Sequence, residues 1–322
     1  MKIAIMGAIH EDGLKELEKA NFQCFEVCNF EEKNLKNELQ NVDGILLRTA
    51  KLNSNILSIC NNLKIVSRHG VGYDNVDINY LNKNKIALGI TSTSNAVSVA
   101  EHVITSFLYL TKNIHLSDKL TREGKFNEKS SLPNFFELYK KNILIFGFGR
   151  IGKAVAKRCS GFEANVYVHD PFVSKKTIEE FNCAPIDKVD GIKLADYITM
   201  HLPLNEKTKN FISQEEFLIM KDSVIIINTA RGGIINEEVL LRFLENKKIR
   251  GAGLDVFETE PPIKSHPLFK LPNVILSPHN AALTLECRKR MAVESAKNII
   301  YFLNNNKNLN LNNIVNREKL EI

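Results

Sequence analysis

Short apolar runs alternate with amphipathic segments from the first residue onward, and no other feature limits the possible fold as strongly. In the N-terminal part of the chain the runs are partly β-branched and comprise residues 2–6, 24–27, 44–47, 64–67 and 86–90. The amphipathic segments between them include residues 12–20, 31–40 and 54–61. Strand-like runs that alternate with helix-like segments are typical of βαβ units around a buried parallel sheet.

A second series of the same kind begins at Asn142. Its apolar runs are residues 142–146, 165–169, 197–200, 223–228, 251–254 and 273–277, and a helical segment near 285–304 ends the chain. The length of 322 residues fits two domains. We therefore predict two Rossmann/flavodoxin-like α/β domains with parallel sheets and a ligand cleft between them.

Two segments separate the two series. In the first, Val99, Val103, Phe107 and Thr111 follow the spacing of one helix face, so this apolar helix either connects two domains or packs against a second subunit. The second segment, residues 121–141, is charged, contains Pro133 and shows no clear period. We predict that this second segment connects the domains.

The composition excludes several classes of protein. Hydrophobic residues make up 44% and charged residues 25%, as in ordinary soluble globular proteins. Lys and Arg outnumber Asp and Glu by 43 to 37 without forming any block of five or six like charges, so we expect no nucleic-acid partner. No apolar stretch approaches the ~20 residues that cross a bilayer, and we expect no membrane insertion. The six cysteines form neither a CxxC pair nor a zinc-like spacing with His, so we expect a cytoplasmic protein without a metal.

The run at 142–146 leads into the sharpest local motif, a GxGxxG loop that opens a helix. Gly147 permits the tight turn, Gly149 lets backbone amides approach a pyrophosphate, and Gly152 permits close packing of helix on strand. Asp170 ends the next strand, where a carboxylate that binds a ribose belongs. Because this carboxylate would accept bonds from a 2′-hydroxyl and repel a 2′-phosphate, the sequence predicts NAD rather than NADP. The alternatives are a purely structural glycine turn and a solvated acid.

Further motifs follow in order along the chain. They are Arg48 in LLRTA and the segments 68–77, 95–102, 228–233, 253–262 and 277–282. Together with the glycine loop, these motifs make the chain resemble the D-isomer-specific 2-hydroxyacid dehydrogenases, closest to the members that act on 3-phosphoglycerate. The resemblance covers residues 48–282, which is most of the chain.

The resemblance implies three catalytic residues. His279 is the acid/base that moves the hydroxyl proton, Glu260 holds its imidazole, and Arg231 binds the substrate carboxylate and polarises the carbonyl. The chemistry supports this assignment, because oxidation of a 2-hydroxy acid needs a base, a cation for the carboxylate and a nicotinamide that takes the hydride. Taken singly, each residue has an ordinary alternative as a loop histidine, a turn acid or a surface cation.

The resemblance also implies the binding residues. The cofactor positions are Gly147, Gly149, Arg150, Ile151, Gly152, Asp170, His201, Leu202, Pro203, Thr229, Ala230, Asp255, His279 and Ala281. The substrate positions are Arg48, Gly70, Val71, Gly72 and Arg231, while the roles of Arg68 and His69 stay open. We expect a substrate domain made of residues 1–95 plus 286–322 and an NAD-binding Rossmann domain made of residues 96–285.

We favour 3-phosphoglycerate as the substrate, because Arg48 matches a phosphate-contacting position and the formal charge of +6 suits a dianion. The first alternative is a sister enzyme that acts on glyoxylate, hydroxypyruvate or lactate. The second is a non-catalytic, NAD-sensing corepressor, against which the three catalytic residues argue. We also expect a homodimer. The chain stops at Ile322, so we expect no C-terminal regulatory domain and no serine feedback through one.

Overall fold

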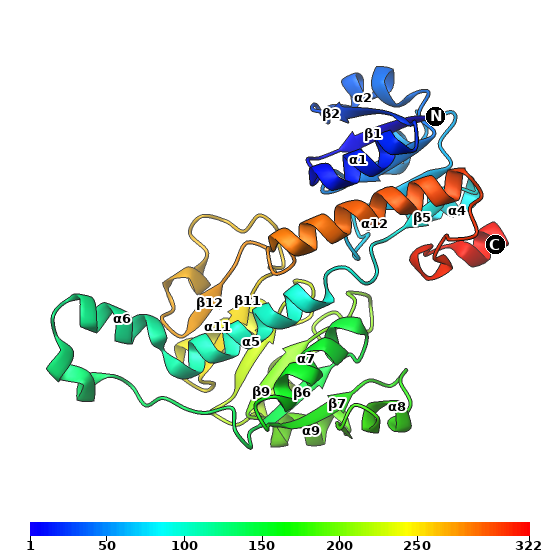
Figure 1. Ribbon diagram of the computed structural model, residues 1–322. Coiled ribbons are helices and arrows are strands. Elements are labelled where there is room, and N and C mark those ends of the chain that lie inside the picture. Colours follow the sequence, from blue (N-terminus) through cyan, green and yellow to red (C-terminus); the bar gives the residue numbers. More distant parts are fainter. The chain divides into compact units, whose positions relative to one another are not determined.

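The computed structural model describes residues 1–322, apart from the side chain of Glu32, and divides into two compact units (Figure 1). Unit 1 comprises Met1–Asn95 and Leu283–Ile322, and unit 2 comprises Ala96–Ala282. The chain returns from unit 2 to unit 1 at residues 282–283 and not at the expected boundary 285–286. The physical reason is that Thr284 caps the C-terminal helix, which packs within unit 1.

Unit 1 is built on a five-stranded parallel sheet with the order β2-β1-β3-β4-β5, the strand order of flavodoxin-like folds. Its elements are β1 (Lys2–Met6), α1 (Glu11–Lys19), β2 (Gln23–Val27), α2 (Glu32–Leu39), β3 (Gly44–Leu47), α3 (Ser54–Leu57), β4 (Ile65–Arg68), α4 (Ile78–Lys83), β5 (Ala87–Gly89), α12 (Leu285–Leu303), η3 (Leu311–Asn313) and α13 (Arg317–Leu320). Both faces of the sheet are covered. Ala4 and Met6 of β1 belong to one apolar cluster and Ile3 and Ile5 to another, because successive side chains of a strand point to opposite faces.

The long C-terminal helix α12 lies against α1 (Figure 1). The two helices approach so closely that a Cβ on Gly13 would lie 2.7 Å from the carbonyl oxygen of Ala292. Leu17 of α1 and Ile299 of α12 are both buried in the same apolar cluster. A glycine on α1 therefore sets the distance at which the end of the chain returns to the N-terminal sheet.

Unit 2 is built on a seven-stranded parallel sheet with the order β12-β11-β10-β9-β6-β7-β8. Its elements are α5 (Ala96–Lys112), α6 (Ile114–Arg122), η1 (Phe126–Ser131), β6 (Asn142–Phe146), α7 (Arg150–Ser160), β7 (Asn165–His169), α8 (Lys175–Glu179), β8 (Ala184–Pro185), α9 (Lys188–Leu194), β9 (Tyr197–Met200), α10 (Gln214–Leu218), β10 (Ile225–Asn228), α11 (Glu237–Glu245), β11 (Gly251–Leu254), η2 (Pro267–Lys270) and β12 (Val274–Leu276). The strand order reverses between β6 and β9, as in doubly wound dinucleotide-binding folds. The predicted fold class, two α/β domains with parallel sheets, is confirmed.

The expectation that residues 121–141 connect the domains is wrong. They lie inside unit 2, where α6 and η1 precede β6, and the chain passes between the units at residues 95–96 and 282–283. Helix α5 belongs to unit 2 because its apolar face is buried there. Val103 and Phe107 join the apolar cluster that contains Ile143 and Val155, so this face is not left for a second subunit.

The helices in the described part of the chain include none that is both long enough and apolar enough to span a membrane.

We predict that Gly13→Val destabilises the protein, because the added side chain collides with the backbone of α12. Overpacking of this kind costs about 1–3 kcal/mol. The free energy of unfolding from urea titration measures it, and Glu18→Val on the exposed side of the same helix is the matched control. An equal effect of the two substitutions would contradict the helix–helix contact as the cause.

Candidate active site

The sheet of unit 2 aligns the ends of six strands in one register. The strand-final residues pair across the sheet as His169–Phe146, Phe146–Met200, Met200–Asn228, Asn228–Leu254 and Leu254–Leu276. The residues that follow these ends are Asp170, Gly147, His201, Thr229, Asp255 and Ser277. Most of the positions expected from the sequence therefore lie along one carboxyl edge, the place where open α/β sheets bind their ligands.

The glycine loop has a backbone shape that side chains would prevent. Gly147 has φ of 90°, and a Cβ on Gly152 would lie 2.1 Å from the carbonyl oxygen of Gly147. A Cβ on Gly149, in contrast, would meet nothing within 4 Å. Helix α7 begins at Arg150 and Ile151 directly after this open position. The N-terminal amides of α7 are therefore accessible to an anion such as a pyrophosphate.

Asp170 is held beside the glycine loop by two backbone amides. Its Oδ2 accepts a hydrogen bond from the Phe148 N–H at 2.7 Å, and its Oδ1 accepts one from the Phe172 N–H at 2.9 Å. Each carboxylate oxygen can accept a further bond. The position fits a pair of ribose hydroxyls, which need acceptors close to the loop that faces the phosphates.

His201 follows β9 next to the turn at Gly147, where the strand order reverses. Burial lowers the pKa of His201 to about 3, so its imidazole is neutral at physiological pH. Its Nε2 lies 3.1 Å from Thr199 Oγ1, and its Nδ1 has no hydrogen-bond partner in the part of the chain that the structure describes. Leu202 is half-buried and Pro203 is exposed.

The turn after β10 is shaped by Asn228, a residue to which the sequence assigned no role. Its Oδ1 accepts a bond from the Ala230 N–H at 3.0 Å, and its Nδ2 donates to the Arg231 carbonyl at 2.8 Å. Thr229 is buried, and its hydroxyl has no partner among the described residues. The Arg231 guanidinium bonds the Ala230 carbonyl through Nη1 at 2.6 Å. The sequence does contain a signal that could have pointed to Asn228, namely a polar amide at the end of the apolar run 223–228.

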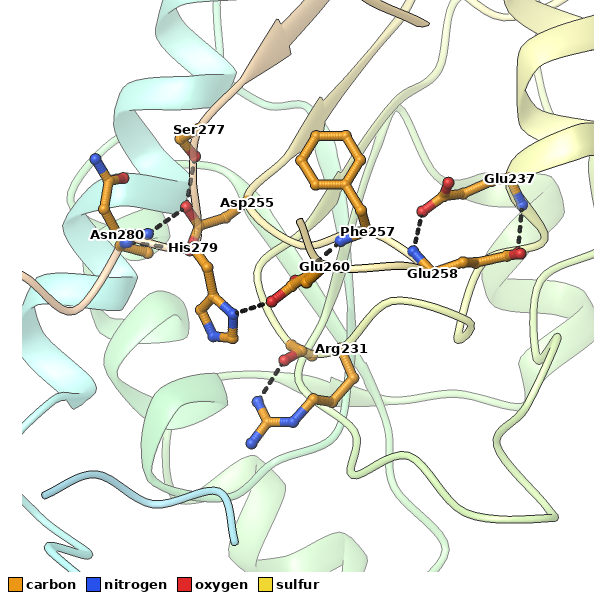
Figure 2. A network of polar contacts seen from close by, with 11 residues as sticks. Arg231, Glu237, Asp255, Phe257, Glu258, Glu260, Ser277, His279 and Asn280 are labelled. Atoms are coloured by element: carbon orange, nitrogen blue, oxygen red, sulfur yellow. Dashed lines mark hydrogen bonds and ion pairs between the residues drawn. The ribbon is translucent and has the colours of Figure 1, made fainter. Parts of the chain in front are cut away.

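Glu260 and His279 are brought together although they come from different loops. The Nδ1 of His279 lies 2.8 Å from Glu260 Oε2, and Glu260 Oε1 accepts a bond from the Phe257 N–H at 3.1 Å (Figure 2). His279 has a left-handed backbone with φ of 51°, and its N–H donates to the Asp255 carbonyl. The side chain of His279 is 51% exposed and that of Glu260 is 37% exposed, so a ligand can reach the pair. Because Nδ1 faces the carboxylate, Nε2 is the ring atom left for a reacting group.

Asp255 is a buried carboxylate that organises the His279 loop. Its Oδ1 accepts bonds from the Ser277 hydroxyl at 2.6 Å and the Asn280 N–H at 2.8 Å (Figure 2). Its Oδ2 accepts one from the Ala281 N–H at 3.0 Å. Only Oδ2 retains room for a further donor such as a carboxamide. Ser277, whose hydroxyl also contacts His102 Nε2 at 3.1 Å, received no role from the sequence.

The remaining candidates lie at the carboxyl edge of the sheet in unit 1. Arg48 follows β3 and donates from Nη1 to the Ala8 carbonyl at 2.9 Å. Gly70 has φ of 151° and begins the loop that continues with Val71 and Gly72. Arg68 braces this loop by donating to the His69 carbonyl at 3.1 Å and to the Asn75 side chain at 3.3 Å.

His69, whose role the sequence left open, is a buried residue of unit 1. Burial, with a contribution from the Arg48 charge, lowers the pKa of His69 to about 4, so the ring is neutral at physiological pH.

Within the described residues, no group of three or more His, Cys, Asp or Glu side chains is arranged to hold a metal ion.

The chain is similar to proteins of one known family. Residues 104–281 match the family model of the D-isomer specific 2-hydroxyacid dehydrogenase, NAD binding domain. The chain is 34% identical, over its full length, to the D-3-phosphoglycerate dehydrogenase of Archaeoglobus fulgidus, of which it covers 60%. It is 35% identical to the hydroxypyruvate reductase of Thermotoga maritima, over 84% of this chain and 88% of that protein.

A solved structure agrees over nearly the whole chain. The D-lactate dehydrogenase from Aquifex aeolicus, complexed with NAD and lactic acid, has a TM-score of 0.85 at 27% identity and covers 97% of this chain and 98% of that one. The chain spans only 57–60% of the length of three similar D-3-phosphoglycerate dehydrogenases. From the matching domain and the similarity over nearly full length to shorter relatives, the chain belongs to the D-isomer-specific 2-hydroxyacid dehydrogenase family, with residues 104–281 as its NAD-binding domain.

Proposed function

We propose that this chain is an NAD-dependent oxidoreductase that transfers a hydride between nicotinamide and C2 of a D-2-hydroxy acid or its 2-keto acid. The observation that supports this most directly is the 2.8 Å contact between His279 Nδ1 and Glu260 Oε2, which leaves Nε2 available to the substrate oxygen. Arg231 extends from the neighbouring loop, which contacts the turn that carries Glu260 (Figure 2). This set supplies an acid/base, an orienting carboxylate and a cation for the substrate carboxylate.

Each residue has a separate part in the reduction of a 2-keto acid. Bound NADH supplies the hydride. Arg231 binds the substrate carboxylate and polarises the keto group, and protonated His279 donates a proton from Nε2 to the keto oxygen. Glu260 keeps the ring oriented and stabilises its positive charge. In the oxidation direction, His279 accepts the hydroxyl proton at the same nitrogen.

We assign the cofactor to the carboxyl edge of unit 2. The glycine loop and the start of α7 fit the pyrophosphate, and Asp170 fits the ribose. The unpartnered polar atoms at His201 and Thr229, among the described residues, suit a ligand that supplies their missing bonds. The full set of proposed cofactor contacts is Gly147, Gly149, Arg150, Ile151, Gly152, Asp170, His201, Leu202, Pro203, Thr229, Ala230, Asp255, His279 and Ala281.

For the substrate we favour 3-phosphoglycerate and 3-phosphohydroxypyruvate, as in serine biosynthesis, with the amides of Gly70, Val71 and Gly72 at the carboxylate and Arg48 at the phosphate. Arg48 donates to a carbonyl and, among the described residues, not to a carboxylate, which leaves its charge for an anionic ligand. Relatives named D-3-phosphoglycerate dehydrogenase support this choice. The second candidate is a glyoxylate or hydroxypyruvate reductase, which relatives of similar identity favour.

We also propose a homodimer in a reducing, cytoplasmic compartment. Ile114, Phe126 and Phe135 are exposed apolar residues on and near α6 and η1, and they provide a surface for a second copy in place of the buried face of α5. Cysteines that are free thiols, such as the exposed Cys28, fit a reducing compartment. Light scattering at micromolar concentration is expected to give twice the chain mass, and a stable monomer would contradict the dimer.

His279→Ala is expected to lower kcat with 2-keto acids by about 10²–10⁴-fold, because the proton donor is lost. NADH binding, followed by nicotinamide fluorescence, should persist because the glycine loop is intact. His115→Ala, on helix α6, is the matched control. Near-normal turnover of His279→Ala would contradict the acid/base assignment.

Asp170 is expected to set the preference for NAD. Asp170→Ala removes the acceptor for the ribose hydroxyls and the charge that repels a 2′-phosphate, so KM for NADH should rise and the gap to NADPH should narrow. Steady-state kinetics with both cofactors measures the ratio. A wild-type enzyme that uses NADPH as well as NADH would show that the carboxylate does not discriminate.

The substrate choice is tested by a panel of 3-phosphohydroxypyruvate, hydroxypyruvate and glyoxylate with NADH. If Arg48 contacts the phosphate, Arg48→Ala should raise KM for the phosphorylated substrate by about ten- to a hundred-fold, the worth of one charge-assisted bond. Glyoxylate should be little affected. Equal losses on both substrates, or no turnover of the phosphorylated one by the wild type, would favour a reductase for glyoxylate or hydroxypyruvate.

A further inference from the structure

We propose that Glu237 is a positioning residue, whose carboxylate holds the loop of Arg231 and the turn of Glu260 at a fixed distance from each other. The inference rests on the proposed function, because it concerns the alignment of two of the residues assigned to the reaction. Glu237 touches neither of them. It acts through Glu258, on the turn that follows β11.

The two segments are joined by a reciprocal pair of hydrogen bonds. The Glu237 N–H donates to Glu258 Oε1 at 3.0 Å, and the Glu258 N–H donates to Glu237 Oε1 at 2.5 Å (Figure 2). Glu237 is the first residue of α11 and ends the loop that starts at Arg231. Glu258 lies two residues before Glu260. The pair of hydrogen bonds therefore joins the loop that carries Arg231 to the turn that carries Glu260.

A second contact joins the same two segments without any side chain. A Cβ on Gly232 would lie 1.8 Å from the Phe257 carbonyl oxygen and 2.6 Å from the Glu258 nitrogen. The backbones therefore touch at the residue next to Arg231, which only glycine permits. Close contact at one point and the reciprocal pair at another prevent rotation of one segment against the other.

Glu237 is a largely buried acid at the start of α11. Its side chain is 13% exposed, and its Oε2 lies 3.4 Å from His266 Nε2. Burial, with the nearby Glu258 charge, raises the pKa of Glu237. The cap of α11 is already provided by Asn236, whose Oδ1 accepts the Val239 N–H at 3.0 Å. Burial of a carboxyl group is costly, and the contacts that offset the cost here are those with the Glu258 N–H and with His266.

The link reaches the reacting groups in two steps. Phe257, which precedes Glu258, donates its N–H to Glu260 Oε1, and Glu260 Oε2 holds His279 Nδ1 (Figure 2). A shift of Glu258 therefore moves the donor that fixes Glu260. A misplacement of about 1 Å can cost on the order of a hundred-fold in rate.

The test compares four single variants and one double variant of the whole protein in the reduction of the best 2-keto acid by NADH. Glu237→Ala should lower kcat by about ten-fold or more, with KM and the Kd of NADH changed less than about two-fold, because binding groups remain. Glu237→Gln should recover most of kcat, since its amide oxygen still accepts the Glu258 N–H. Glu258→Ala removes the reciprocal bond from an exposed side chain and should lower kcat too. Glu238→Ala, on the exposed side of the same helix, should leave kcat unchanged.

The outcomes separate this inference from the proposed function. No turnover of any 2-keto acid by the wild type and Glu238→Ala would overturn the proposed function and the inference with it. Normal turnover by those two and by Glu237→Ala would overturn the inference alone. A loss in Glu237→Ala that accompanies a proportional loss of NADH binding, or that Glu237→Gln does not recover, would also overturn it. Glu237→Ala removes the acceptor of the Glu258 N–H, and Glu258→Ala removes the acceptor of the Glu237 N–H. Because the two bonds act as one link, the losses in the double variant Glu237→Ala/Glu258→Ala are expected not to multiply.

Discussion

The in-register ends of the parallel strands in unit 2 are the constraint on which the candidate site depends. Phe146, Met200, Asn228 and Leu254 pair laterally as the last residues of neighbouring strands, so the next residue of each strand leaves the sheet at the same level. A shift of one residue in any strand would turn its side chains to the other face. The buried, apolar residues of these strands make such a shift costly, and core packing thereby determines the geometry of the edge.

Buried polar groups convert this edge into specific loop shapes. Asp255 is 2% exposed, and three donors from the 277–281 segment compensate for the burial of its charge. The amide of Asn228 fixes the turn that leads to Arg231 through two hydrogen bonds to the backbone of that turn. The side chains that are open to ligands, Glu260 and His279, are therefore supported by side chains that are not. Satisfied buried groups of this kind are rigid, as the proposed proton transfer requires.

Much of the fold and of the site could be predicted because its signals are local. Alternating runs indicated both parallel sheets, and the glycine loop indicated the nucleotide-binding strand and helix. Family membership, expected from the motifs, is confirmed by the matching domain and by relatives of similar length. The segment 121–141 was assigned wrongly because polarity and lack of period describe any exposed segment, whether it joins domains or extends from one.

The sequence by itself predicted which residues carry the proposed chemistry, and it determined the order in which the strands and helices follow. Only the tertiary structure decided which of these residues meet. Glu237 and Glu258 are far apart in the chain and carry no motif that pairs them, yet they exchange two hydrogen bonds across adjacent loops. The same holds for Asp255 with Ser277 and for Gly13 with Ala292. The physical reason is that hydrophobic period and turn residues encode local backbone conformation, whereas contacts between distant segments depend on strand order and packing distance, which arise when the whole core closes.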